Sequence, residues 1–147
     1  MKKILPYERK VYYYETDKMG IMHHSNYIRL LEESRISFLE QVGLPFNKIE
    51  EQGIMVPVLL AQCQYFKPLV FDEPFAVYPL ITHFNGVKFE LFYRIISRRT
   101  GNVCAEGITS HCFTDNNLKP IRTKTNYPEI YKVFHDYTGY AITETEE

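Results

Sequence analysis

The sequence contains no tryptophan and only three cysteines among its 147 residues. Cys63, Cys104 and Cys112 are odd in number and scattered, and no two of them form a C-x-x-C pair. A structural zinc site or a disulfide framework would need more cysteines at closer spacing. We therefore expect free thiols, as in a reducing cytosol.

Long apolar runs are also missing. No stretch approaches the roughly 20 apolar residues that a transmembrane helix requires, which excludes a membrane span. The first five residues include two lysines, and they are followed by Pro6 and charged residues instead of the apolar core of an export signal. These features predict a cytoplasmic protein.

An excess of positive charge is absent as well. The chain has 17 lysines and arginines against 18 aspartates and glutamates, which gives a net charge of -1. Binding of phosphate backbones requires a cationic surface, so we expect no nucleic-acid partner. Apolar residues are plentiful, at 45% of the sequence, and residues 1–147 are enough for a single folded domain.

The spacing of apolar residues changes along the chain. Residues 8–16, rich in valine and tyrosine, predict a strand, and residues 24–42 predict a long helix that is apolar around most of its circumference. A short second helix is expected at residues 45–52. Asn126 is predicted to cap a terminal helix that has Pro128 in its first turn. Four further strands follow from apolar residues at every second position, at residues 56–67, 75–84, 87–95 and 103–114.

The order of these elements limits the architecture. A helix that is apolar on most sides must be covered on several of them. A strand, a long helix, four strands and a final helix predict an α+β fold in which an antiparallel sheet wraps around the long central helix, with a helix at the C-terminus.

The segment from Tyr13 to Tyr27 contains the residues best suited to catalysis. A β-rich stretch ends at Asp17, Gly20 follows three residues later, and a histidine pair opens the long helix. The first N–H groups of a helix have no partner within it and carry partial positive charge. A carboxylate beside them suits acyl transfer, because the acid can attack or deprotonate water while the N–H groups hold the carbonyl oxygen. The same aspartate also fits an ordinary Asx-turn.

Residues 13–27 read Y-x-x-T-D-x-x-G-I-x-x-H-x-x-Y, and E-x-x-R follows at Glu32 and Arg35. This pattern resembles the hotdog-fold thioesterases of the 4-hydroxybenzoyl-CoA thioesterase group, and within it the YbgC-like acyl-CoA thioesterases. The similarity extends to about Tyr131. It includes the shorter pieces Gly53-Ile54, Val56-Pro57, Ala105-Glu106-Gly107, Phe113-Thr114-Asp115 and Lys119-Pro120.

The resemblance implies an acyl-CoA thioesterase that uses no cofactor. It implies that Asp17 is the catalytic carboxylate, as general base or as nucleophile, and that the backbone N–H at His24 polarises the thioester carbonyl. It adds the His24 side chain and Tyr13 as active-site groups, and Lys88 as the residue that matches the charge of the coenzyme A phosphate site. It also implies a homo-oligomer, a dimer or a tetramer, whose sheets pair edge to edge.

Other interpretations of these residues stay open. His24 can simply cap the helix, Tyr13 can belong to the core, and Glu32 can form an ion pair with Arg35 on the same helix face. Within enzymes, an acyl-carrier-protein thioesterase is an alternative, and outside enzymes a non-catalytic acyl-CoA-binding protein. Because His23 and His24 have no further ligand at metal-binding spacing, we expect no metal site.

Overall fold

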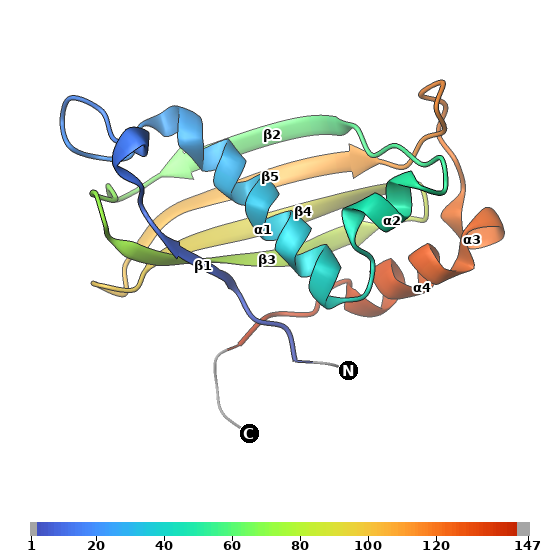
Figure 1. Cartoon of the computed structure of the whole chain (residues 1–147). Coiled ribbons are helices and arrows are strands. Elements are labelled where there is room, and N and C mark those ends of the chain that lie inside the picture. The colour runs from blue at the N-terminus through green and yellow to red at the C-terminus, as the bar shows by residue number, and fades with distance from the viewer. Residues whose placement is uncertain (1–2, 144–147) are drawn as a thin grey trace.

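The computed structural model describes residues 3–143 as an antiparallel sheet with a long helix lying diagonally across one face (Figure 1). Met1, Lys2 and residues 144–147, to which the prediction of a single domain also extends, lie outside the described residues. The strands are β1 (Tyr7–Lys10), β2 (Val58–Tyr65), β3 (Pro74–Phe84), β4 (Lys88–Ser97) and β5 (Val103–Cys112). The helices are α1 (Tyr27–Gln41), α2 (Phe46–Glu50), α3 (Thr123–Asn126) and α4 (Pro128–Tyr137), with the short 3-10 helices η1 (Tyr13–Glu15) and η2 (His24–Asn26).

The sheet has the order β1-β3-β4-β5-β2, and every neighbouring pair is antiparallel. The hairpin between β3 and β4 turns at Gly86, whose φ of +92° favours glycine. Asn85 Oδ1 accepts hydrogen bonds from the backbone N–H groups of Val87 and Lys88 at 2.9 and 2.7 Å, which fixes this turn. Within the described residues, β2 has a neighbouring strand on one side only, so its other side is an open edge.

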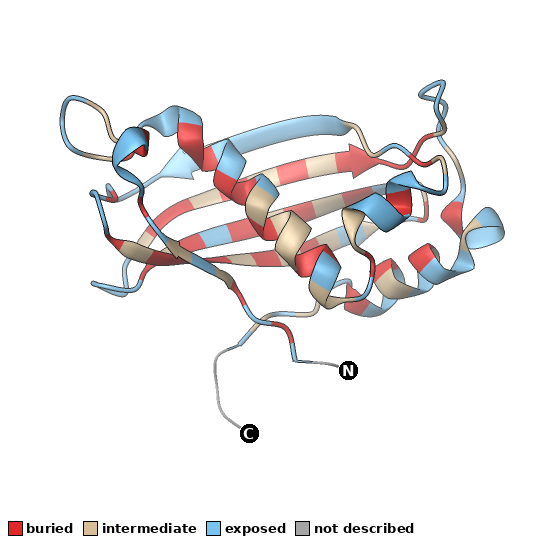
Figure 2. Cartoon of the chain, in the orientation of Figure 1, coloured by how far each residue is buried: buried red, intermediate tan, exposed pale blue. Residues whose placement is uncertain are grey.

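The core lies between α1 and the sheet. Figure 2 shows buried residues on the strands beneath α1, whereas β2 is exposed along almost all of its length. Leu30, Leu31 and Phe38 of α1 are almost fully buried. A Cβ atom on Gly107 of β5 would lie 2.6 Å from Leu31 Cδ1, so the glycine permits the close approach of helix and strand.

The α+β architecture predicted from the sequence is confirmed, and two details of the central helix differ. The regular α-helix begins at Tyr27, after the 3-10 turn η2, although a helix was predicted from residue 24. The helix is also not covered all round, because the side chain of Ile28 is 38% exposed. In the described range 3–143, no helix is long and apolar enough to cross a membrane.

The predicted strand at residues 8–16 is wrong beyond Lys10. The chain leaves the sheet there and forms η1, because the Glu15 carboxylate accepts a hydrogen bond from the Tyr12 N–H at 2.9 Å and binds the guanidinium of Arg9. These local polar contacts outweigh the β propensity of the tyrosines. The predicted cap at Asn126 is also wrong: Asn126 ends α3, and Tyr127 precedes Pro128 at the start of α4.

Candidate active site

Asp17 lies in a tight turn between η1 and the start of the helical segment. Its backbone N–H donates to the Ile21 carbonyl at 2.9 Å, and the Gly20 N–H donates to the Asp17 carbonyl at 2.9 Å. Asp17 Oδ1 accepts from the Met19 N–H at 2.8 Å, so the Asx-turn is present. The other carboxylate oxygen has no hydrogen-bond partner among the described residues, which leaves it available for chemistry.

The start of the helical segment is fixed by side chains. His23 Nδ1 accepts from the Ser25 N–H at 3.1 Å. Asn26, only 7% exposed, donates from Nδ2 to the Glu15 carbonyl at 3.0 Å and to the His23 carbonyl at 3.3 Å. Asn26 therefore ties the helix start to the segment that carries the aspartate. The backbone N–H of His24 has no acceptor within residues 3–143, so it is free to bind a carbonyl oxygen.

An ion cluster holds η1 against α1. Arg9 donates to both oxygens of Glu15, at 3.0 and 2.7 Å, and to Glu33 of α1 at 3.1 Å. Burial raises the pKa of Glu15, but the hydrogen bonds from Arg9 and from the Tyr12 N–H outweigh it and hold that pKa below its usual value. Glu15 is thus a stable anion that fixes the segment just before Asp17.

An open cleft of about 330 Å³ brings Asp17 and His24 together. Tyr65, at the end of β2, closes one side: its hydroxyl donates to the His24 carbonyl at 3.5 Å, and its ring meets Tyr27 edge-on at 4.9 Å. Burial raises the pKa of both phenols, so neither adds a negative charge near neutral pH. The full lining consists of Asp17, Met19, Ile21, Met22, His24, Tyr27, Tyr65, Phe66, Lys67 and Pro68.

Two residues predicted for the site lie outside this lining. Tyr13 is 76% exposed and packs edge-on against Phe71 at 5.5 Å, so it is neither a cleft residue in one subunit nor a core residue. Lys88, exposed at the start of β4, lies at the opposite end of the sheet (Figure 1). The His24 side chain is exposed and stacks on His23 at 4.3 Å. The roles of Tyr13 and Lys88 remain predictions.

Tyr65, Asn26 and the role of Glu15 in fixing the segment before Asp17 were not predicted from the sequence. Asn26 lies inside the motif, and asparagine often caps helices, so a role for Asn26 at the helix start could have been predicted. Tyr65 comes from a strand far along the chain, and no local pattern marks it as a cleft residue. The proposed pairing of Glu32 with Arg35 is also replaced, because Arg35 donates to the Tyr93 hydroxyl at 3.0 Å and no ion pair joins it to Glu32 in the described structure.

The cleft offers a carboxylate and a backbone N–H group, but no cluster of ligands. Across the described residues, no three His, Cys, Asp or Glu side chains stand close enough together to hold a metal ion. The cleft chemistry therefore consists of an acid that can activate water or attack a carbonyl, beside an N–H donor for the oxygen that becomes negative.

Comparisons with known proteins identify the family of this chain. Residues 11–133 match the model of the thioesterase-like superfamily. The YneP protein of Bacillus subtilis, provisionally named an acyl-CoA thioesterase, is 30% identical over 86% of this chain and 92% of its own length. A crystal structure of a protein of undetermined function from Aquifex aeolicus has a TM-score of 0.81 and 35% identity, covering 88% of this chain and 98% of that one.

A DHNA-CoA thioesterase from Staphylococcus aureus has a TM-score of 0.84 and 26% identity, over 88% of this chain and 87% of that chain. The five-stranded antiparallel sheet and the helix across it are those of the hotdog-fold thioesterases. This chain belongs to the thioesterase-like superfamily and is a thioester hydrolase.

Proposed function

We propose that this protein hydrolyses an acyl-CoA to the free acid and coenzyme A in the cleft that contains Asp17. The observation that carries the proposal is that Asp17 and His24 line the same cleft. Within residues 3–143, one carboxylate oxygen of Asp17 and the backbone N–H of His24 have no hydrogen-bond partner. The name of the YneP relative supports an acyl-CoA substrate. Three unpaired cysteines support the cytoplasmic location.

In the proposed reaction, the His24 N–H donates a hydrogen bond to the thioester carbonyl oxygen and stabilises its negative charge in the tetrahedral intermediate. Asp17 removes a proton from water as the water oxygen bonds to the carbonyl carbon. The C–S bond then breaks, and the thiolate takes up a proton to leave as coenzyme A. In the alternative route, the Asp17 carboxylate attacks the carbonyl carbon and expels the thiolate, and water then hydrolyses the resulting anhydride to the free acid and the Asp17 carboxylate.

Purified protein should hydrolyse at least one acyl-CoA without added metal and in the presence of EDTA. A panel of short, medium, long and aromatic acyl-CoA esters, followed by thiol detection, measures this directly. Activity that is lost with EDTA and restored by zinc would contradict the mechanism. Faster hydrolysis of acyl groups on acyl carrier protein would favour the carrier-protein alternative, and acyl-CoA binding without thiol release would favour a binding protein.

The open edge of β2 supports a homo-oligomer. β2 exposes Leu59 by 53% and Leu60 by 44%, and a long apolar edge strand is an aggregation hazard unless it is paired. We propose that two β2 strands pair antiparallel across this edge. That arrangement would bring the far end of the partner sheet, including the partner subunit's Lys88, toward the Asp17 cleft, where it can bind coenzyme A phosphates.

Light scattering should give a mass of at least twice the 17.4 kDa of one chain. Replacing Leu59 and Leu60 together by lysine should shift the protein toward monomer, because the paired edge would then have to take charged side chains out of water. Leu118→Lys is the matched control, since Leu118 is 61% exposed in a turn outside β2. A wild-type protein that stays monomeric at working concentration would contradict the paired edge.

A further inference from the structure

Arg9 of β1 is buried beside the segment that carries Asp17. Its side chain is 10% exposed and lies between two aromatic rings, with Cζ at 4.3 Å from the centre of the Tyr12 ring and 5.4 Å from that of Phe75. A charge buried this deeply must be paired. Arg9 is not among the described residues that line the Asp17 cleft, so its partners decide what it does.

Each of the three guanidinium nitrogens of Arg9 donates to a carboxylate. Nη1 and Nη2 bind the two oxygens of Glu15 at 3.0 and 2.7 Å, and Nε binds Glu33 Oε1 at 3.1 Å. The Tyr7 hydroxyl donates to the same Glu33 oxygen at 2.9 Å. A planar guanidinium can hold two carboxylates at once, whereas the ammonium group of lysine cannot reproduce this fork. Arg9 therefore fixes the separation of Glu15 in η1 and Glu33 in α1.

Glu15 connects this ion cluster to both groups that the proposed reaction uses. Its backbone carbonyl accepts from the His23 N–H at 2.8 Å and from Asn26 Nδ2 at 3.0 Å. His23 directly precedes His24, and Asp17 follows Glu15 by two residues. A shift of Glu15 would therefore move the Asp17 carboxylate relative to the His24 N–H.

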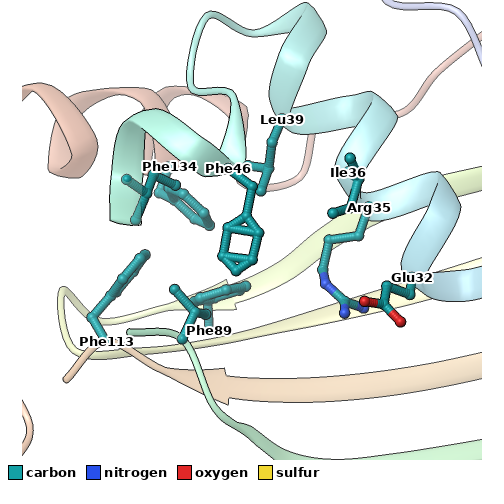
Figure 3. A pocket seen from close by; sticks show the side chains of 10 residues that line it. Glu32, Arg35, Ile36, Leu39, Phe46, Phe89, Phe113 and Phe134 are labelled. Carbon is teal, nitrogen blue, oxygen red and sulfur yellow. The ribbon is translucent and has the colours of Figure 1, made fainter. Parts of the chain in front are cut away.

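The other end of the ion cluster is on a helix that is itself held against the sheet. Arg35, two residues after Glu33 on α1, donates to the Tyr93 hydroxyl of β4 at 3.0 Å. Figure 3 shows the far end of α1, where Leu39 and a group of phenylalanine rings surround a small pocket between the helix and the sheet. Groups that must keep a reactive geometry are best supported by rigid elements. Arg9 ties the turn that carries Asp17 to such an element.

We propose that Arg9 is a positioning residue for thioester hydrolysis, because its ion cluster holds the Asp17 carboxylate and the His24 N–H at the separation that the reaction needs. This proposal rests on the proposed function. Arg9 acts through these two groups and does not contact the substrate. A displacement of about 1 Å in a reacting group can cost roughly 10²-fold in rate, so a loosened cluster should slow the chemical step.

The test compares the steady-state kinetics of the wild type and Arg9→Lys on the acyl-CoA that the wild type hydrolyses fastest. Lysine keeps the charge but cannot hold both carboxylates, so kcat should fall by about 10- to 100-fold. KM should stay within about threefold of the wild-type value, because the residues lining the cleft are unchanged. Glu15→Gln should have the same effect, since it breaks the same contact from the other side.

The double variant Arg9→Lys/Glu15→Gln shows whether the two residues act as one unit. Its kcat should lie within about threefold of the slower single variant, because substitutions that remove one shared contact are not additive. Losses that multiply in the double variant would overturn the proposal.

Arg94→Lys is the matched control. Arg94 also uses Nε and Nη2 to bind a carboxylate, that of Glu106, with both nitrogens at 2.9 Å from Oε2. Its Cζ lies 5.4 Å from the centre of the Phe92 ring, and it is outside the lining of the cleft. This variant should keep the wild-type kcat, and an equal loss of kcat in it would overturn the proposal.

Urea denaturation of each variant gives the folded fraction at the assay temperature, so that kcat can be expressed per folded molecule. A wild-type kcat in Arg9→Lys and Glu15→Gln, or a change confined to KM, would overturn the positioning role. If neither variant folds, the ion cluster serves folding and the positioning role is also overturned. A wild type that hydrolyses no acyl-CoA would end the proposed function and this proposal with it, whereas an active wild type with unaffected variants would end this proposal alone.

Discussion

Asp17→Asn is expected to reduce kcat for acyl-CoA hydrolysis by about 10²- to 10⁴-fold, the usual cost of losing a general acid or base. The asparagine oxygen can still accept the Met19 N–H that now binds Oδ1 at 2.8 Å, so the turn should persist. The charge that activates water or attacks the carbonyl is lost. Steady-state kinetics should therefore show a fall in kcat with KM and the melting temperature nearly unchanged.

Asp115→Asn is a suitable control for this experiment. Asp115 Oδ1 also accepts backbone N–H groups in a turn, from Asn117 at 2.8 Å and Lys119 at 3.0 Å, but it lies outside the cleft. The control should keep wild-type kinetics. His24→Ala should cost less than Asp17→Asn, because the backbone N–H remains. Near-wild-type turnover in Asp17→Asn would contradict the assignment, and unfolding would show that the turn is the main role of Asp17.

The regular elements could be predicted because their sequence patterns are direct consequences of burial. Alternation in β4 puts Phe89, Leu91 and Tyr93 on the face toward α1, and all three are buried. The segment before Asp17 could not be predicted in this way. Its path depends on Arg9 binding Glu15 and also Glu33 of α1, which is 24 residues along the chain from Arg9. Such contacts exist only once the helix and strand are packed.

The candidate site also contains residues that local sequence could predict and residues that depend on the packed fold. Asp17 and His24 lie seven residues apart in one continuous motif, so local geometry was enough to predict that both face one cleft. Tyr65 reaches the cleft only through the register of β2 on β5, in which it pairs with Ala105. Lys88 was assigned to the coenzyme A phosphate site only because of its positive charge. The antiparallel sheet puts it at the far end from Asp17.

A buried histidine makes the stability of this protein sensitive to acid. His111 is 1% exposed, and its Nε2 lies 2.8 Å from Thr109 Oγ1, which in turn lies 2.7 Å from the Tyr93 hydroxyl. Arg35 donates to that hydroxyl. Because an arginine can only donate, the Tyr93 hydroxyl donates to Thr109 Oγ1, and the Thr109 hydroxyl donates to His111 Nε2. Nε2 is therefore an acceptor, and His111 carries its proton on Nδ1. Nδ1 has no partner among the described residues.

Burial, together with the positive charge of Arg35, lowers the pKa of His111 to about 3 from its usual 6.5. The folded protein therefore keeps His111 neutral, while the unfolded chain binds a proton below about pH 6.5. The stability that depends on His111 is complete above pH 6.5 and is lost progressively as the pH falls toward 3. Between pH 7 and pH 5 the free energy of unfolding should fall by about 2 kcal/mol through His111 alone.

Urea denaturation of the wild type and of His111→Gln between pH 5 and 7.5 tests this expectation. The substitution removes the titrating group, so the free energy of unfolding should fall by about 2 kcal/mol less between pH 7 and pH 5 than in the wild type. His135→Gln, which changes an exposed histidine on α4, should keep the wild-type dependence of the free energy of unfolding on pH. If the free energy of unfolding of His111→Gln depends on pH as strongly as that of the wild type, the prediction is contradicted. If that variant does not fold, NMR titration of the wild-type imidazole decides the matter, because a His111 pKa near 6.5 would exclude this source of acid sensitivity.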